Sequence, residues 1–184
     1  MFRLALGGVL VALLPFFPPA DPKASCCAPD SGTKASESSA LDIVKSWVGT
    51  WAELDAEDQP TGKVVSKFSV TAGGSAVLEI LFPGTKEEMV SVYSIDDGKL
   101  VMDHYCLYGN QPRYEGKVSE DGKTIEWRCA GGGNLKDHSR AHMHEGVTKI
   151  LSADRMEGDW TALENGATIM REQFHLGRKS TGVR

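Results

Sequence analysis

Residues 99–130 read KLVMDHYCLYGNQPRYEGKVSEDGKTIEWRCA, and this stretch decides the fold. It holds three runs in which apolar and polar residues alternate, separated by Gly109-Asn110 and by the sequence EDG at 120–122. Alternation with a period of two is typical of β-strands, and short loops of Asn, Asp and Gly are typical of antiparallel hairpins. The stretch therefore predicts three consecutive antiparallel strands.

The same alternation continues on both sides of this stretch, from Gly49 to Gly177. The candidate strands are 49–56, 62–70, 75–82, 87–95, 99–108, 111–119, 123–130, 141–151, 154–163 and 167–177. A Gly-rich corner at 71–74 and a longer loop at 131–140 are the connections that differ from short hairpin loops. Hairpin-linked strands of similar length lose their exposed edges by closing on themselves. The sequence therefore predicts an all-β fold, an antiparallel up-and-down β-barrel of about ten strands.

A short helix is expected directly before the first strand. The sequence SALDIVKSWVGTW at 39–51 places apolar residues at helical spacings and offers Ser39 as an N-terminal cap. The stretch 26–40 is rich in small and polar residues, so we expect it to be a disordered linker. The barrel domain is then expected over 41–179, followed by a disordered tail at 180–184.

The overall composition fits one folded domain. A chain of 184 residues with 41% hydrophobic content is long enough for one well-buried core and short for two. Its net charge is -5 and its basic residues are scattered, so it offers no electrostatic footprint for a phosphate backbone. Nucleic acid is therefore not expected as a partner.

Residues 1–25 have the pattern of an export signal peptide. Arg3 precedes an uncharged apolar run from Leu4 to Phe17, which is too short to span a bilayer, and Ala20 offers a small residue at a cleavage site. We therefore expect an exported chain, periplasmic or secreted, whose mature form has no membrane-spanning segment. The alternative is a lipid anchor attached through Cys26.

The sequence Gly49-Thr50-Trp51, directly after the expected helix, resembles the G-x-W signature that opens the barrel of calycins. This group contains the lipocalins, the fatty-acid-binding proteins and the nitrobindins. The resemblance implies that a late arginine packs across Trp51 and closes the base of the barrel, with Arg178 as the first choice and Arg171 as the other. It also implies a small, partly apolar ligand in the barrel interior. The sequences HYCLYGNQPR at 104–113 and HMH at 142–144 resemble a family of exported bacterial proteins as well.

Strand alternation assigns the histidines to faces. His104 falls on the same face as its apolar neighbours Leu100 and Met102, so it is either a hydrogen-bonded core residue or a contact at a cavity wall. His142 and His144 are two residues apart and share one strand face, a spacing that lets two imidazoles bind one metal ion. The pattern therefore indicates either a ligand pocket or a metal site.

A metal site would need a third ligand, for which His104 and His138 are the candidates. We expect the first of these to face the barrel interior together with the HMH histidines, so that the expected metal set is His104, His142 and His144. The expected ligand contacts are His104, Tyr108, Arg113, His142 and His144.

Other chemistry has weaker support in the sequence. The nitrobindins that the chain resembles hold haem through a histidine, and His175 lies on the last candidate strand, but the chain has no CxxCH, so covalent haem is excluded. The sequence contains no nucleophile elbow, phosphate loop or helical HExxH motif. His104, Tyr105 and Glu145 are the acid–base candidates, and an enzyme is the least supported function.

Two side-chain pairings can also be predicted. Cys106 and Cys129 are expected to be free thiols, because strand 111–119 should lie between them and hold their backbones roughly 10 Å apart. Arg113 is expected to pair with Glu126 on the next strand or with an acidic ligand.

Overall fold

The computed structural model of the chain describes residues 34–135 and 138–179. A helix, α1 (Lys34–Lys45), precedes ten strands: β1 (Gly49–Leu54), β2 (Pro60–Thr71), β3 (Ala76–Leu81), β4 (Met89–Asp96), β5 (Lys99–Tyr105), β6 (Gln111–Val118), β7 (Thr124–Gly133), β8 (His142–Ser152), β9 (Arg155–Glu164) and β10 (Ala167–Arg178). The Gly-rich corner between β2 and β3 is a turn of 3-10 helix, η1 (Ala72–Gly74). Each expected strand corresponds to one observed strand.

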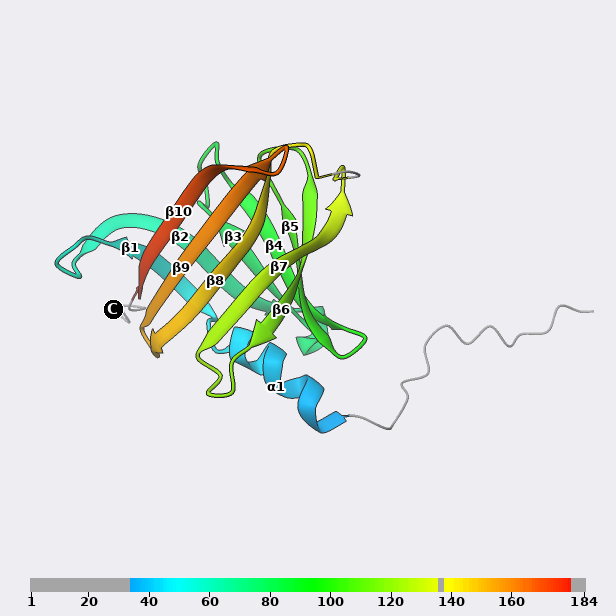
Figure 1. Ribbon diagram of the computed structural model, residues 1–184. Coiled ribbons are helices and arrows are strands. Elements are labelled where there is room, and N and C mark those ends of the chain that lie inside the picture. The colour runs from blue at the N-terminus through cyan, green and yellow to red at the C-terminus, as the bar shows by residue number, and fades with distance from the viewer. Residues whose placement is uncertain (1–33, 136–137, 180–184) are drawn as a thin grey trace, which may run out of the picture. The chain divides into compact units, whose positions relative to one another are not determined.

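The ten strands close into a barrel (Figure 1). Each strand pairs antiparallel with its neighbours in the chain, and β1 also pairs with β10 through Trp51 opposite Arg178 and Glu53 opposite Leu176. Closure gives every strand a hydrogen-bonded neighbour on both sides along this order. The expected all-β fold, a ten-stranded antiparallel up-and-down β-barrel preceded by a short helix, is confirmed.

The helix begins earlier than the sequence pattern suggested. α1 starts at Lys34, so Ser39 lies inside the helix and the helix overlaps the stretch 26–40 that was expected to be a linker. The residues Lys, Ala and Glu that open this segment are good helix formers, which compensates for its lack of large apolar side chains.

Residues 1–33 and 180–184, with the expected signal peptide, Cys26 and the tail, lie outside the described residues. Within 34–135 and 138–179, no helix has the length and apolar character needed to cross a membrane.

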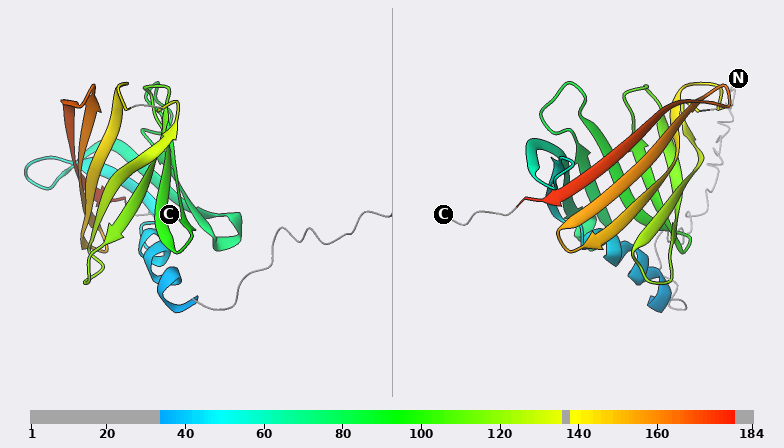
Figure 2. Two further views of the ribbon diagram at one scale, coloured as in Figure 1. Left: turned by 45° about the vertical axis from the view of Figure 1, so that its right-hand side comes forward. Right: turned by 60° about the vertical axis from the view of Figure 1, so that its left-hand side comes forward.

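Helix α1 covers one end of the barrel (Figures 1 and 2). Its residues Leu41 and Val44 are buried in the barrel core, and the Trp47 ring that follows packs edge-on against Phe68 and Tyr93. Because successive strands run in opposite directions, the loops β3–β4, β5–β6, β7–β8 and β9–β10 all lie at the opposite end, called the far end below. The barrel therefore has one end covered by the helix and one end formed by loops.

The contact expected between Trp51 and Arg178 is present at the helix end. The guanidinium carbon of Arg178 lies 4.3 Å from the centre of the Trp51 ring. Trp51 is buried and donates its indole N–H to the carbonyl oxygen of Trp47 at 2.7 Å. Arg171, the other candidate, is exposed on the outer wall of the barrel.

Two glycines make room for core tryptophans. Gly116 on β6 lies opposite Trp127 on β7, and Gly146 on β8 lies opposite Trp160 on β9. A Cβ atom added to Gly116 would lie 2.6 Å from the Trp127 ring, and one added to Gly146 would lie 2.3 Å from the Trp160 ring. The two rings therefore fold across the neighbouring strand, over positions where any larger residue would clash.

Candidate ligand cavity and histidine cluster

A cavity of about 370 Å³ occupies the barrel interior. It extends from Trp47 at the helix end to Leu107 and Tyr108 at the far end, so the expected ligand residue Tyr108 does line it. Most of its wall is aromatic, aliphatic or thioether, and these residues include Val65, Phe68, Leu81, Met102, Tyr114, Met143, Met156, Trp160 and Phe174. A volume of a few hundred Å³ and a wall of this kind are typical of sites for small, largely apolar molecules.

The cavity wall contains a buried carboxyl group, that of Glu79 on β3. One carboxylate oxygen accepts a hydrogen bond from Ser66 Oγ and the other accepts one from the Tyr93 hydroxyl, each at 2.6 Å. Burial raises the pKa of Glu79, and the hydrogen bonds from these partners oppose that effect. Burial, and then the nearby charge of Glu79, raise the pKa of Tyr93 well above its usual value. Among the described residues no lysine or arginine forms an ion pair with Glu79.

His104 lines the same cavity and is also hydrogen-bonded, so both of its expected roles hold in part. Its Nδ1 atom lies 3.0 Å from Ser91 Oγ, and the residue is 6% exposed. Burial lowers the pKa of His104 to about 4. The imidazole is therefore neutral at pH 7, and Nε2 is the ring nitrogen through which it can reach a ligand.

Trp47, which also lines the cavity, carries a polar group without a hydrogen-bond partner among the described residues. The indole N–H of Trp47 is buried and makes no hydrogen bond to any residue that the structure describes. An N–H group in this situation is normally satisfied by ordered water or by a ligand. Trp47 lines the cavity, but this nitrogen is buried within the wall, so the acceptor oxygens of Glu79 remain the polar atoms offered to a ligand here.

Sequence reasoning missed Glu79 and Tyr93. The signal for Glu79 was present in AVLEIL at 76–81, where this residue shares the strand face of Val77 and Leu81. A charged residue in phase with apolar, inward positions is an informative exception to the usual strand pattern. Tyr93 carried no comparable signal, because a tyrosine within a core strand is common.

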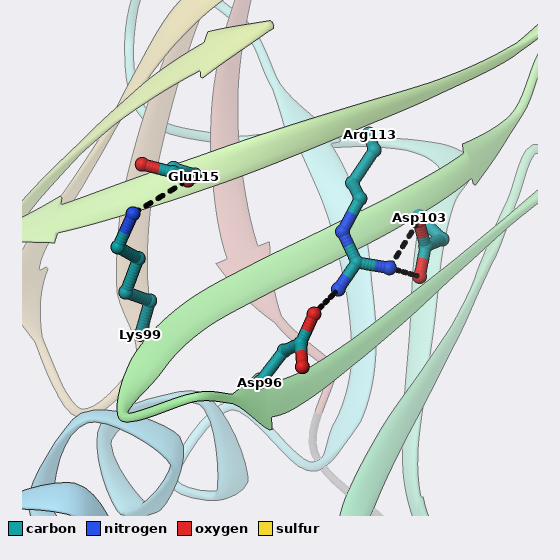
Figure 3. A network of polar contacts seen from close by, with 5 residues as sticks. All are labelled: Asp96, Lys99, Asp103, Arg113 and Glu115. Atoms are coloured by element: carbon teal, nitrogen blue, oxygen red, sulfur yellow. Dashed lines mark hydrogen bonds and ion pairs between the residues drawn. The ribbon is translucent and has the colours of Figure 1, made fainter. Parts of the chain in front are cut away.

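Arg113 lies on the outer surface of the barrel and not in the cavity (Figure 3). Its guanidinium pairs with Asp103 on β5 at 3.1 Å and with Asp96 at the end of β4. Lys99 and Glu115 form a second ion pair beside it, at 2.9 Å. The group is therefore a cross-strand network of outward-facing charges.

The expected pairing of Arg113 with Glu126 is thus wrong, as is its expected role as an interior ligand contact. The strand register explains both errors. Asp103 lies directly opposite Arg113 on β5, whereas Glu126 lies opposite Lys117 further along β6.

His142 and His144 do not line the cavity either, contrary to the expectation. Thr148 on the same strand does line it, and simple alternation from Thr148 would turn both histidines inward. However, β8 carries one extra residue against β9 between Met143 and Glu145, and this β-bulge shifts the alternation by one position. Met143 therefore lines the cavity, and the two histidines lie on the opposite face of the strand.

The two histidines instead join Cys129 and His138 in a group that we call the Cys-His cluster. One side-chain N or S atom from each of the four residues lies within 4.8 Å of all the others. Nε2 of His142 lies 3.4 Å from Nδ1 of His138 and 3.1 Å from Nδ1 of His144. His142 is fully buried and the other three are partly buried. Burial, and then the neighbouring His142, lower the pKa of His144, while burial raises the pKa of the Cys129 thiol.

The cluster lies where β7 and β8 part at the far end of the barrel. The last pair between these strands joins Arg128 to Glu145, so Cys129 is the first β7 residue beyond the pairing. The three histidines come from the β7–β8 loop and from the start of β8. The residue that joins His142 and His144 in this cluster is therefore His138, the other candidate from the sequence, whereas His104 lies on the cavity wall.

The remaining candidates do not gather into a site. His175 is exposed on the outer wall, where Nδ1 lies 3.5 Å from Glu157, so it does not offer a haem ligand to the cavity. Tyr105 is 54% exposed, and Glu145 lies on the outer wall, whereas His104 faces the interior. These three residues therefore do not form an acid–base centre.

Cys106 and Cys129 are both free thiols, as expected. Strand β6 lies between β5 and β7 in the barrel, which keeps the two cysteines apart. The strand order that motivated the prediction is thus also the observed one.

Searches against models of known protein families and against curated proteins find no match for this chain.

Proposed function

We propose that the chain binds a small, partly apolar molecule in the interior of its barrel. The observation that carries this proposal is the placement of Glu79, which is 6% exposed, faces a largely apolar cavity and has hydroxyl partners instead of a cation. Burying a carboxyl group costs free energy that no structural ion pair of the described residues offsets. Ionisable groups placed in this way inside a pocket are characteristic of ligand sites.

The polar groups favour a ligand whose head group donates a hydrogen bond. Each oxygen of Glu79 accepts one bond from a hydroxyl and has a further lone pair to offer. An alcohol or an amine can donate to that lone pair. A ligand carboxylate would instead bring a second negative charge beside Glu79, which disfavours its binding.

Three probes with the same alkyl chain test this proposal: 1-octanol, octylamine and octanoate. Binding is measured by isothermal titration calorimetry and by the fluorescence of Trp47 and Trp160, which line the cavity. We expect one molecule of octanol or octylamine per chain, with octanoate at least about tenfold weaker. Glu79→Gln should remove most of the discrimination against octanoate, whereas Glu115→Gln, on the outer wall beside Lys99, should keep it.

Two results would contradict the proposal. Equal binding of all three probes by the wild-type protein and by Glu79→Gln would refute the role of Glu79. If no probe binds saturably, and if native mass spectrometry of the protein from its own host finds no retained small molecule, the cavity is not a ligand site.

We infer from the sequence of residues 1–25 that this binding function operates outside the cytoplasm, with a lipid anchor at Cys26 as the alternative. Cell fractionation and the intact mass of the mature chain test the inference. A mass that matches cleavage in this stretch without added lipid supports a freely exported protein. An added diacylglycerol mass on Cys26 supports the anchor, and an uncleaved chain in the cytoplasm refutes both.

A further inference from the structure

We propose that Cys129, His138, His142 and His144 form a zinc site in the wall of the barrel, separate from the interior cavity. Cysteine and histidine are the ligands that Zn²⁺ prefers in structural sites, and four such ligands complete its tetrahedral shell. The following observations support this assignment, and none of them depends on the proposed ligand in the interior.

The first observation is the spacing of the four candidate ligand atoms. With metal–nitrogen bonds of about 2.0–2.1 Å and a metal–sulfur bond of about 2.3 Å, ligand atoms in a tetrahedral site lie about 3.3–3.7 Å apart. The distances from His142 Nε2 to the Nδ1 atoms of His138 and His144 are 3.4 and 3.1 Å, and all four atoms lie within 4.8 Å of one another. Only small side-chain movements therefore separate this arrangement from a closed coordination shell.

The second observation is the hydrogen bond that His142 makes outside the cluster. Its Nδ1 atom lies 2.7 Å from the carbonyl oxygen of Arg140, which can only accept, so Nδ1 carries the proton. In the neutral ring Nε2 then presents its lone pair to the centre of the cluster. This is the arrangement in which metal-binding histidines are held by an outer partner.

The nitrogen contacts within the cluster point in the same direction. The single lone pair of His142 Nε2 can accept one hydrogen bond, yet the Nδ1 atoms of both His138 and His144 approach it. At most one of these contacts can be a good hydrogen bond, although His142 is fully buried. A cation at the centre would use all three lone pairs together with the Cys129 thiolate, which loses its proton on binding.

Described residues beside the cluster form hydrogen bonds to neighbouring elements of the barrel. The Asn110 side chain donates to the carbonyl oxygen of Ala141 at 2.7 Å, and the Asn134 side chain donates to that of Gly109 at 3.1 Å. The backbone of Asn165 donates to the carbonyl oxygen of Ser139 at 2.9 Å. Described residues on both sides of 136–137 are therefore held by hydrogen bonds to neighbouring elements, which supports a site of defined geometry.

An ion can also reach the site from solvent. A hollow of about 420 Å³ on the protein surface is lined by His138, His142 and His144. Because four protein ligands leave no open coordination position, we assign the ion a structural role, in which it holds the β7–β8 loop to the start of β8.

Cobalt(II) is the probe that tests this proposal, because tetrahedral Co²⁺ absorbs strongly in the visible and a cobalt–thiolate bond adds a charge-transfer band in the near ultraviolet. The protein is freed of metal by a chelator, titrated with Co²⁺ and then with Zn²⁺. We expect one Co²⁺ per chain, a tetrahedral spectrum with the thiolate band, and displacement by Zn²⁺.

Matched variants identify the ligands. Cys129→Ser should lose the thiolate band, and His138→Ala should weaken Co²⁺ binding at least about 10-fold. The control variants Cys106→Ser and His175→Ala change a thiol and an imidazole outside the cluster, so they should leave the thiolate band and the affinity unchanged. The absence of saturable Co²⁺ and Zn²⁺ binding by the wild-type protein would overturn the proposal without reference to any variant. An unchanged spectrum and affinity in Cys129→Ser and His138→Ala would overturn it as well.

Discussion

Arg178 and Trp51 face each other across the seam between the last strand and the first, with 4.3 Å between the guanidinium carbon and the centre of the indole ring. The same guanidinium donates to the carbonyl oxygens of Ser46 and Ala153, each at 2.9 Å. One side chain thus joins the end of β10 to the α1–β1 connection and to the β8–β9 turn. It stabilises the seam through charge, stacking and hydrogen bonds together.

Replacing this arginine should destabilise the barrel more than replacing the other arginine of the same strand. We expect Arg178→Ala to lower the free energy of unfolding by about 3 kcal/mol, because it removes a cation–π contact and several charge-assisted hydrogen bonds. Arg171→Ala, at an exposed position, should change it by less than about 0.5 kcal/mol. Urea unfolding of the two variants measures the difference, and similar values would show that Arg178 has no special role in closure.

The glycine opposite Trp160 gives a second test of the packing. In Gly146→Ala the new methyl group would lie 2.3 Å from the Trp160 ring, so the ring must move within the barrel. We expect a loss of about 1–3 kcal/mol in unfolding free energy and a changed tryptophan emission spectrum. Gly158→Ala, whose methyl group would lie 3.2 Å from Phe174, should have the smaller effect. Equal stability of Gly146→Ala and the wild type would mean that the ring is not confined as described.

The barrel itself could be predicted from the sequence because its signals are local. Alternating residues define each strand, and short connections rich in Gly, Asn and Asp make consecutive strands neighbours. The turn before β6 nevertheless spans 106–109, and the expected turn residue Asn110 is buried beyond it. The start of α1 could not be predicted from Ser39, because helix-forming residues upstream extend the helix beyond a plausible cap.

The positions of the histidines were harder to predict, because one extra residue in a strand moves the residues beyond it to the other face of the sheet. The bulge between Met143 and Glu145 has no strong sequence signature, yet it turns His142 and His144 out of the interior. Cys129 reaches the same cluster because β7 parts from β8, which depends on the tertiary fold. The local spacing HSRAHMH at 138–144 was the usable signal for three of the four members.

Removal of metal should lower the stability of the protein if the zinc assignment is correct. A ligand that binds the folded state alone stabilises it by about 2.7 kcal/mol when its free concentration is a hundredfold above Kd. The melting temperature of the zinc-loaded protein should therefore fall after chelation and should rise again with added Zn²⁺. His138→Ala should show neither change, and His175→Ala should show both. A melting temperature independent of zinc in the wild type contradicts the structural role.

His104 should make the protein less stable as the pH falls. Its pKa is lowered to about 4 in the folded state from 6.5, so the unfolded chain binds more protons between these values. His104 therefore contributes about 3 kcal/mol to the free energy of unfolding above pH 6.5. This contribution is lost progressively as the pH falls from 6.5 to about 4. In His104→Phe the part of the pH dependence that comes from this imidazole should disappear. Unfolding curves of both proteins at pH 7 and pH 4 measure it, and an equal pH dependence in the two would show that His104 titrates normally.

Glu79 should change the stability with pH in the opposite direction to His104. Burial raises its pKa above 4.5, so the folded state keeps the proton while the unfolded chain has lost it, and stability falls as the pH rises from 4.5 towards the folded pKa. Above pH 4.5 the two effects therefore oppose each other in the wild type. Glu79→Gln removes one of them, so the stability of this variant should rise more steeply with pH than that of the wild type, by up to about 1.4 kcal/mol per pH unit. His104→Phe removes the His104 effect, so its stability should rise less steeply with pH than that of the wild type. Other carboxyl groups contribute equally to all three curves, so the differences between the curves report on Glu79 and His104. Urea unfolding at several pH values provides the comparison, with Glu115→Gln as the control for a lost surface charge. If Glu79→Gln follows the wild-type curve, the Glu79 carboxyl ionises in the folded protein as it does in the unfolded chain.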